Sequence, residues 1–137
     1  MSENKKHYWL YVLKLEQGKY YVGITAKTPQ QRFLEHKNGY MAAQWTRKYK
    51  PLKIIDIKDL GYTEKSVSEA YENKVVRKYM KQFGHNNVRG GDLSYSEDYT
   101  KRFGYYISTK DWEPITVVIL LLLAIAYLLI KQSWHPS

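Results

Sequence analysis

The order of apolar and polar residues predicts neighbouring β-strands near the start of the chain. The run from Tyr8 to Leu15 is almost continuously apolar or aromatic, which is typical of a buried strand. Tyr20 to Ile24 is a second β-prone run, and a short polar link containing Gly18 separates the two. Such a link between two such runs predicts an antiparallel hairpin. A third strand is expected from Leu52 to Ile57.

A helix is predicted after the hairpin. Thr28 is suited to the N-cap, Pro29 to the first helical position, and Gln31 completes a capping box. The helix should extend to about Lys37, because Asn38-Gly39 is a typical stop.

A second helix is predicted from another capping-box pattern, Ser66-Val67-Ser68-Glu69, to about Phe83. Its expected apolar stripe consists of Val67, Tyr71, Val75 and Tyr79. The whole pattern predicts an α/β (α+β) domain in which a small three-stranded antiparallel sheet is flanked by helices.

Ile115 to Ile130 is an apolar run without a charged residue, and it predicts a transmembrane helix over about residues 113–131. The run is about 24 Å long as a helix, against roughly 30 Å of hydrocarbon core. Trp112 and Trp134 flank it as interfacial anchors, while Tyr127 and Lys131 can snorkel. The alternative of a buried core helix fits less well, because the run has no polar face.

Flanking charges predict the orientation of this span. Lys101, Arg102 and Lys110 precede it, whereas only Lys131 follows. By the positive-inside rule, residues 1–110 should face the cytoplasm, and residues 111–137 should form a single-pass tail anchor in the cytoplasmic membrane.

Composition adds a polyanion to the expected partners. The chain has 22 Lys and Arg against 13 Asp and Glu, a net charge of +9, and it is rich in tyrosine. A basic, aromatic domain suits nucleic acid or anionic lipid, although a solvated basic surface has the same composition. The absence of cysteine excludes disulfides and thiolate metal sites. No motif predicts a nucleotide cofactor, and nothing indicates the oligomeric state.

Two loops are candidates for DNA contact. Gln44 to Lys50 interleaves aromatic and basic residues, so Arg47, Lys48 and Lys50 are expected to bind phosphates while Trp45 stacks on bases or packs into the core. Asn87-Val88-Arg89-Gly90-Gly91 is the second loop, in which Asn87 and Arg89 are the candidate contacts.

One ordered set of motifs joins the hairpin to both helices. It consists of Tyr11-Val12-Leu13, Tyr21-Val22-Gly23, Arg32 with His36 one turn later, and Glu69-Ala70-Tyr71-Glu72. The set resembles the GIY-YIG nuclease superfamily, in particular the branch of small single-domain bacterial members and structure-selective endonucleases. Trp9 and Leu10 stand where that family has Gly and Ile, so the first motif keeps only its tyrosine. The resemblance covers a core of about residues 7–91.

This resemblance implies a metal-dependent endonuclease that hydrolyses DNA phosphodiester bonds. Glu72 would bind Mg²⁺ or Mn²⁺, hard cations that take carboxylate ligands, although Glu69 lies close by as an alternative. Glu72 is preferred because a capping role would account for Glu69. The guanidinium of Arg32 fits phosphate oxygens.

Three side chains are candidates for activating water: Tyr11, Tyr21 and His36. A tyrosine has a pKa near 10, so positive charge close by would have to lower it. The resemblance favours a hairpin tyrosine as the base. His36 could instead orient a tyrosine or protonate the leaving group.

Two other functions fit the same sequence. A catalytically inactive GIY-YIG-fold domain could tether DNA to the membrane, since the first motif is altered. A basic domain could instead dock on anionic lipid next to its bilayer-spanning residues 115–130.

Overall fold

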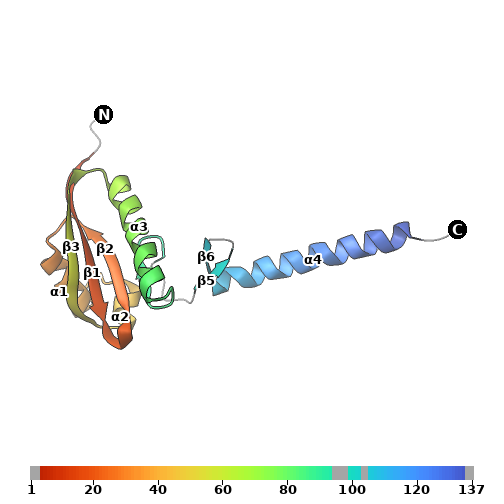
Figure 1. The fold of residues 1–137 in the computed structure, drawn as a ribbon, viewed down its shortest axis with the longest axis horizontal. Helices are drawn as coiled ribbons and strands as arrows, with labels where there is room; N and C mark the ends of the chain where they lie inside the picture. Colours follow the sequence, from red (N-terminus) through yellow and green to blue (C-terminus); the bar gives the residue numbers. More distant parts are fainter. Residues whose placement is uncertain (1–3, 94–98, 103–104, 135–137) are drawn as a thin grey trace. The chain divides into compact units, whose positions relative to one another are not determined.

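The structure is a computed structural model that describes residues 4–93, 99–102 and 105–134. Two compact units divide the chain: Met1–Ser96 and Glu97–Ser137. The first unit contains the hairpin, both predicted helices and a mixed sheet, and the second contains a short hairpin and a long helix (Figure 1).

The sheet of the first unit has four strands in the order β3-β1-β2-β4. Strand β1 (Lys6–Leu15) lies in the centre and pairs antiparallel with both β2 (Tyr20–Thr25) and β3 (Pro51–Thr63). Its continuous apolar run is buried, as expected for a strand covered on both faces. The predicted hairpin is therefore confirmed, and a one-turn 3₁₀ helix at Glu16–Gly18 makes its connection.

The expectation of three antiparallel strands is wrong, because β4 (Val88–Gly90) pairs in parallel with β2. Three residues give too short a run to be recognised as a strand from periodicity. The third predicted strand, Leu52 to Ile57, is also longer than expected. Register shifts against β1 let β3 continue to Thr63.

Helix α1 (Pro29–Asn38) begins and ends as predicted. The Thr28 hydroxyl accepts from the Gln31 backbone N–H, and the Gln31 side chain returns to the Thr28 N–H, which forms the full capping box. At the other end Gly39 has φ of 78°, the left-handed conformation that ends helices at glycine.

Helix α3 (Lys65–Phe83) differs from the prediction in its start and in its buried stripe. It begins one residue before Ser66, and its N-cap, Glu64, makes no side-chain cap. The expected capping box at Ser66 to Glu69 is therefore wrong. The buried positions are Ser68, Glu72, Val76 and Met80, one residue later than the predicted apolar stripe. This rotation turns Glu72 inward.

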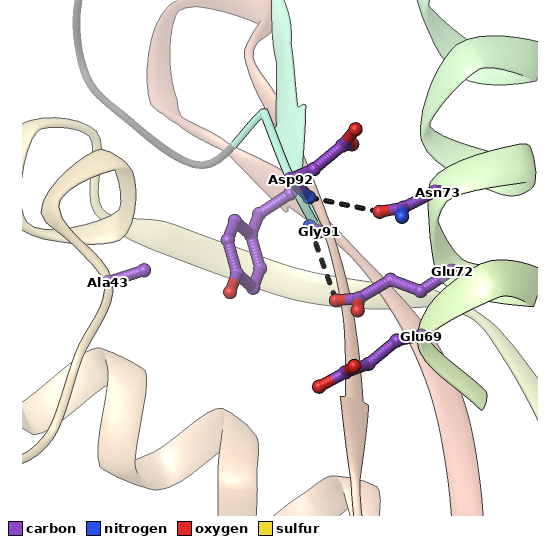
Figure 2. Close-up of a pocket in the computed structure, with 7 residues that line it drawn as sticks. Ala43, Glu69, Glu72, Asn73, Gly91 and Asp92 are labelled. Atoms are coloured by element: carbon purple, nitrogen blue, oxygen red, sulfur yellow. Dashed lines mark hydrogen bonds between the residues drawn. The ribbon is translucent and has the colours of Figure 1, made fainter. Parts of the chain in front are cut away.

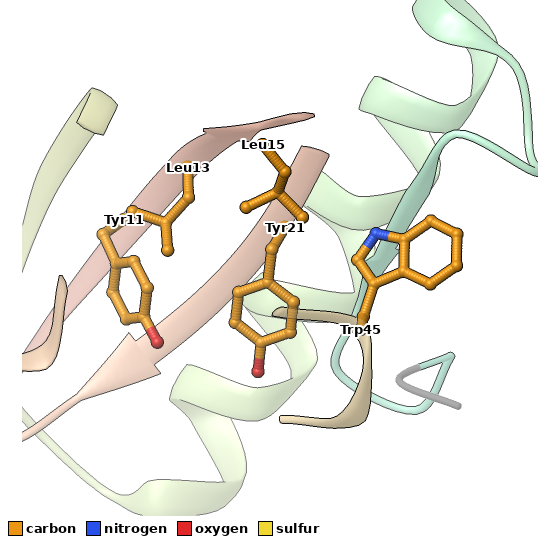
Figure 3. Close-up of a cluster of buried hydrophobic side chains, with 5 residues drawn as sticks. All are labelled: Tyr11, Leu13, Leu15, Tyr21 and Trp45. Atoms are coloured by element: carbon orange, nitrogen blue, oxygen red, sulfur yellow. The ribbon is translucent and has the colours of Figure 1, made fainter. Parts of the chain in front are cut away.

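The segment expected as a loop from Tyr40 to Lys50 contains a short helix, α2 (Gln44–Lys48). Of the two alternatives for Trp45, the structure has the packed one. Trp45 is 2% exposed and lies in a cluster with Leu13, Leu15, Tyr11 and Tyr21 (Figure 3). Its indole N–H donates to the Tyr20 carbonyl at 3.0 Å, which ties α2 to the sheet.

The second unit contains a hairpin that the sequence did not predict, formed by β5 (Tyr99–Arg102) and β6 (Tyr105–Ser108). Helix α4 (Thr109–Ser133) follows and includes the predicted apolar run. Pro114–Ser133 is long and apolar enough to cross a membrane, with a mean hydropathy of 2.5 and no buried residue in that stretch. The side chain of Trp112, an expected anchor, lies outside the described part of the chain.

Candidate active site

Two tyrosines from neighbouring strands form one wall of the candidate site. Tyr11 on β1 and Tyr21 on β2 point in the same direction, and their ring centroids are 6.3 Å apart (Figure 3). Tyr20, the neighbouring residue on β2, instead stacks on Phe83 with ring centroids 4.2 Å apart. Tyr21 and not Tyr20 therefore lies beside Tyr11.

His36 connects helix α1 to the first tyrosine. Its Nε2 lies 2.8 Å from the Tyr11 hydroxyl oxygen, and its Nδ1 lies 2.9 Å from Thr46 Oγ1 on α2. The Thr46 hydroxyl donates in turn to the Ala43 carbonyl oxygen at 3.0 Å. Tyr11, His36 and Thr46 are all buried, so the structure holds this hydrogen-bonded chain away from solvent.

Arg32 lies one turn before His36 and is half-buried. Its guanidinium donates to the Glu35 carboxylate at 2.7 Å and to the Met41 carbonyl at 3.0 Å. Burial acts to lower the pKa of Arg32, but the Glu35 hydrogen bond and the nearby tyrosines outweigh it and raise that pKa. Arg32 therefore carries a permanent positive charge beside Tyr11 and Tyr21.

Glu72 reaches the site from α3, where strands β2 and β4 separate. Their parallel pairing ends at Val22 and Gly90. Beyond that point the Gly91 N–H donates to a Glu72 oxygen at 3.3 Å (Figure 2). The backbone of Ile24 also acts to lower the pKa of this carboxylate.

An open pocket of about 390 Å³ lies in front of Glu72. Its lining consists of Tyr21, Ala43, Glu69, Glu72, Asn73, Gly91 and Asp92, with the carboxylates of Glu69 and Glu72 on the α3 side (Figure 2). Burial raises the pKa of Glu72 to about 7, and the charges of Glu69 and Asp92 contribute. Among the residues that the structure describes, no cation pairs with Glu72, and such a buried carboxylate at the edge of a polar pocket is suited to receive a cation.

Burial also sets the protonation of the other side chains. It raises the pKa of Tyr11 well above its usual range and that of Tyr21 to about 12, although the charge of Arg32 opposes both shifts. Burial and then Arg32 lower the pKa of His36 to about 4. At neutral pH both tyrosines are hydroxyl groups and His36 is a neutral imidazole.

Comparison with known proteins identifies the family of this domain. The profile of the GIY-YIG catalytic domain matches residues 7–87. The chain belongs to the GIY-YIG family. A UPF0213 protein of Enterococcus faecalis (strain ATCC 700802 / V583) is 34% identical over 84 residues, which cover 59% of this chain and 93% of that protein. No solved structure matches the chain significantly.

GIY-YIG domains usually belong to endonucleases, and such nucleases generally use divalent metal ions. A nuclease domain of this family implies DNA as the substrate. The match covers nearly all of the Enterococcus relative, so little of that protein remains that could correspond to the C-terminal part of this chain.

The residues of this GIY-YIG domain fit a divalent ion through a single buried carboxylate. Within residues 4–93, 99–102 and 105–134, no group of three His, Asp or Glu side chains converges in a way that could hold a metal. Glu72 would therefore supply one ligand, and water and substrate oxygens would complete the shell, as is usual for Mg²⁺. Glu69 lines the same pocket but is exposed and pairs with Lys65 at 3.7 Å.

Two groups of predicted DNA-contacting residues of the GIY-YIG domain differ in their surroundings. Arg47, Lys48 and Lys50 are exposed around α2. Asn87 donates to the Phe83 carbonyl at 2.7 Å and accepts from Lys19 at 2.8 Å. Arg89 has no exposed surface: it donates to two backbone carbonyls and lies 4.5 Å from the Trp45 ring centroid. In this structure Arg89 joins α2 to the sheet.

Three residues of the GIY-YIG site were not among the side chains that the sequence singled out. Thr46 was included only in a basic loop, and no spacing indicated its bond to His36. Asn73 accepts from the Asp92 N–H at 2.9 Å and thereby fixes the turn that presents the Gly91 N–H to Glu72. Gly91 has φ of 52°, so the paired glycines were a usable signal for this turn.

Proposed function

We propose that this protein is a metal-dependent endonuclease that hydrolyses DNA phosphodiester bonds while held at a membrane. The observation that carries the proposal is that five side chains lie close together and that two of them, Tyr21 and Glu72, line one pocket. Arg32 and Glu72 both act on the pKa of Tyr11 and Tyr21, and His36 bonds Tyr11 directly.

Each side chain has a role in phosphodiester hydrolysis. The charged guanidinium of Arg32 binds a non-bridging oxygen of the scissile phosphate and stabilises the negative charge that develops there. Glu72 would hold a divalent ion, which would supply Lewis-acid chemistry to the same phosphate. Tyr21, which lines the pocket, positions the water or the phosphate by its hydroxyl.

Water activation requires a proton acceptor. Burial raises the pKa of Tyr11, so its hydroxyl keeps its proton at neutral pH and cannot by itself take another from water. His36 lies within hydrogen-bond distance of the Tyr11 hydroxyl and has an unprotonated ring nitrogen at neutral pH. We therefore assign water activation to the Tyr11–His36 pair rather than to a tyrosinate.

The test is cleavage of duplex, nicked and branched DNA by the full-length chain in detergent, with Mg²⁺ or Mn²⁺. Wild-type protein should cut, whereas Arg32→Ala and Glu72→Gln should be at least about 100-fold slower, as expected when a preorganised charge is lost. Glu69→Gln is the matched control, because Glu69 lies on the same helix and lines the same pocket.

The results have distinct meanings. Loss of cutting in Glu69→Gln but not in Glu72→Gln would exchange the two ligand assignments. Salt-sensitive DNA binding by the wild type without cleavage under either metal would refute the enzyme and indicate a DNA-tethering module instead.

The membrane part of the proposal rests on helix α4. The apolar stretch Pro114–Ser133 has 20 residues, about 30 Å as a helix, which matches the hydrocarbon core. Its side chains are uncovered all round within the second unit. The preceding segment carries Lys101, Arg102 and Lys110, so we assign the nuclease domain to the cytoplasmic side.

Fractionation of cells expressing the full chain tests this anchor. Wild-type protein should stay in the membrane pellet after carbonate washing, and Leu122→Arg with Leu123→Arg should move it to the supernatant. Each arginine at a helix centre costs about 3 kcal/mol of insertion. Leu122→Ile with Leu123→Ile is the apolar control, and a wild-type protein released by carbonate would refute the anchor.

Orientation can be read from single cysteines, because the chain has none of its own. An impermeant maleimide added to intact cells should label Ser137→Cys and spare Lys5→Cys. The reverse pattern would place the nuclease domain on the outer side.

A further inference from the structure

In the series of hydrogen bonds that links Ala43, Thr46, His36 and Tyr11, the donor and the acceptor of each bond can be assigned. A carbonyl oxygen can only accept, so the contact of 3.0 Å between Thr46 Oγ1 and the Ala43 oxygen uses the single hydroxyl proton of Thr46. Such a bond from a threonine to a carbonyl in the preceding helical turn is a common local interaction. With its proton engaged, Thr46 Oγ1 can only accept from His36 Nδ1, 2.9 Å away.

The assignment continues through the imidazole. A neutral histidine carries one ring proton, and a proton on Nδ1 leaves Nε2 as an acceptor. The Tyr11 hydroxyl, 2.8 Å from Nε2, is then the donor. Its oxygen remains free to accept a further hydrogen bond, and the nearby charge of Arg32 acts to lower the pKa of this hydroxyl.

The opposite arrangement leaves buried groups unsatisfied. If Nε2 carried the proton, Thr46 would have to donate to Nδ1, and its oxygen would lie 3.0 Å from the Ala43 oxygen with no proton between them. Tyr11 would then accept from His36 and lose the acceptor for its own proton. Tyr11, His36 and Thr46 are each 1% exposed, so solvent does not compensate such losses.

We propose that Thr46 is a positioning residue that holds His36 in the Nδ1–H tautomer and thereby makes the Tyr11 hydroxyl a donor to His36. The catalytic consequence rests on the proposed nuclease function, but the tautomer itself does not. Thr46 touches neither DNA nor metal in this role and acts only through His36.

The tautomer determines where a proton from water can go. As Tyr11 passes its hydroxyl proton to His36 Nε2, its oxygen takes one proton from the attacking water. Tyr11 ends neutral, His36 ends as an imidazolium, and the hydroxide forms its bond to phosphorus while the bond to the leaving oxygen breaks. In the other tautomer Nε2 already carries a proton, so this route is closed.

The charges around His36 agree with a transient rather than a permanent imidazolium. Arg32 disfavours the charged ring and Glu35 favours it, while burial disfavours it most. An incoming phosphodiester brings a negative charge that offsets Arg32.

Nuclear magnetic resonance of the histidine rings tests the tautomer without any reaction. Long-range ¹H–¹⁵N spectra of the full chain in detergent at pH 7.5 distinguish Nδ1–H from Nε2–H, and His36→Gln identifies the signals of His36 among the four histidines. Wild type and Thr46→Ser should show Nδ1–H. Thr46→Val, which keeps the shape but loses the hydroxyl, should shift His36 to Nε2–H.

Cleavage by the same variants tests the consequence. Thr46→Val should cut at least about tenfold more slowly with an unchanged KM for DNA, and Thr46→Ser should recover most of the rate. Circular dichroism melting checks that each variant is folded.

The two measurements fail in different ways. An Nε2–H tautomer in the wild type, or an unchanged tautomer in folded Thr46→Val, overturns the proposal. A wild type that does not cut refutes the proposed function and leaves the tautomer result to decide the role of Thr46. Full cutting by Thr46→Val despite a changed tautomer refutes the proton route.

Discussion

Gly23 lies directly opposite Tyr11 on the neighbouring strand, and a Cβ at Gly23 would stand 2.5 Å from the Tyr11 hydroxyl oxygen. The Tyr11 ring thus lies against the backbone of Gly23, which has no side chain. The second motif needs glycine here because the Tyr11 hydroxyl occupies the space of a methyl group.

Gly23→Ala should therefore reduce cutting by about 100-fold, since a displacement of about 1 Å at a reacting group has this effect. Steady-state cleavage measures it. Gly18→Asn is the control: it lies in the same hairpin, has nothing within 4 Å of its Cβ, and has a positive φ that asparagine tolerates. Equal rates for both variants would contradict the assignment of Tyr11.

Substitution of Arg89 by alanine should affect the stability of the fold, whereas substitution of Arg47 should affect DNA binding. Arg89 is buried against Trp45. Its loss should destabilise the fold by about 3 kcal/mol or more, because two carbonyls lose a charged donor and a cavity forms. Arg47 is exposed, so Arg47→Ala should change stability by less than about 0.5 kcal/mol but weaken DNA binding and reduce its salt dependence.

Chemical denaturation and DNA titration at several salt concentrations separate the two effects. A stable Arg89→Ala protein with weakened DNA binding would instead place Arg89 at the DNA interface.

His36 should make the fold sensitive to acid. Its pKa is about 4 in the folded protein because of burial and Arg32, against an ordinary value of 6.5. Between these two values the unfolded chain binds a proton that the folded chain does not. The free energy of unfolding should thus fall by about 1.4 kcal/mol per pH unit from pH 6.5 down to pH 4, on account of this group.

His36→Gln removes this contribution, and the difference between the two unfolding curves isolates it from Glu72, whose raised pKa acts in the opposite direction. Parallel curves for the wild type and His36→Gln over this pH range would contradict the prediction.

Glu72→Gln should stabilise the metal-free protein while it abolishes cutting. Above pH 7 the buried carboxylate is charged, and no cation in the described part of the chain pairs with it, so an amide of the same shape removes a cost of about 1 kcal/mol or more. Added Mg²⁺ or Mn²⁺ should raise the Tm of the wild type, because an ion that binds only the folded state stabilises it. Thermal melts with and without metal measure both effects, and an equal metal shift in Glu72→Gln would show that the ion binds elsewhere.

The sequence predicted those elements whose signals are local. Thr28, Pro29 and Gln31 define the start of α1 by short-range bonds, and Gly39 defines its end. The hairpin was predictable for the same reason, since its two apolar runs are adjacent in the chain.

Elements that depend on distant residues were predicted incompletely. Strand β4 is three residues long and exists because β2 offers it a free edge. The inward face of α3 contains Ser68 and Glu72, which have no apolar signal, so the periodicity favoured Val67, which is 55% exposed. The motif order led to the prediction of Glu72, which the structure places in the pocket lining, whereas only the structure brought Thr46, Asn73 and Gly91 to the site.

The parallel pairing of β2 with β4 also determines how short a working fragment of this nuclease can be. The family profile ends at residue 87, one residue before β4 begins. A fragment cut there would lose the Gly91 N–H from Glu72 and would expose the edge of β2, a template for aggregation between copies. Leu93 closes β4 by exchanging two backbone bonds with Gly90, so an expression vector for crystallisation should encode the chain at least through residue 93.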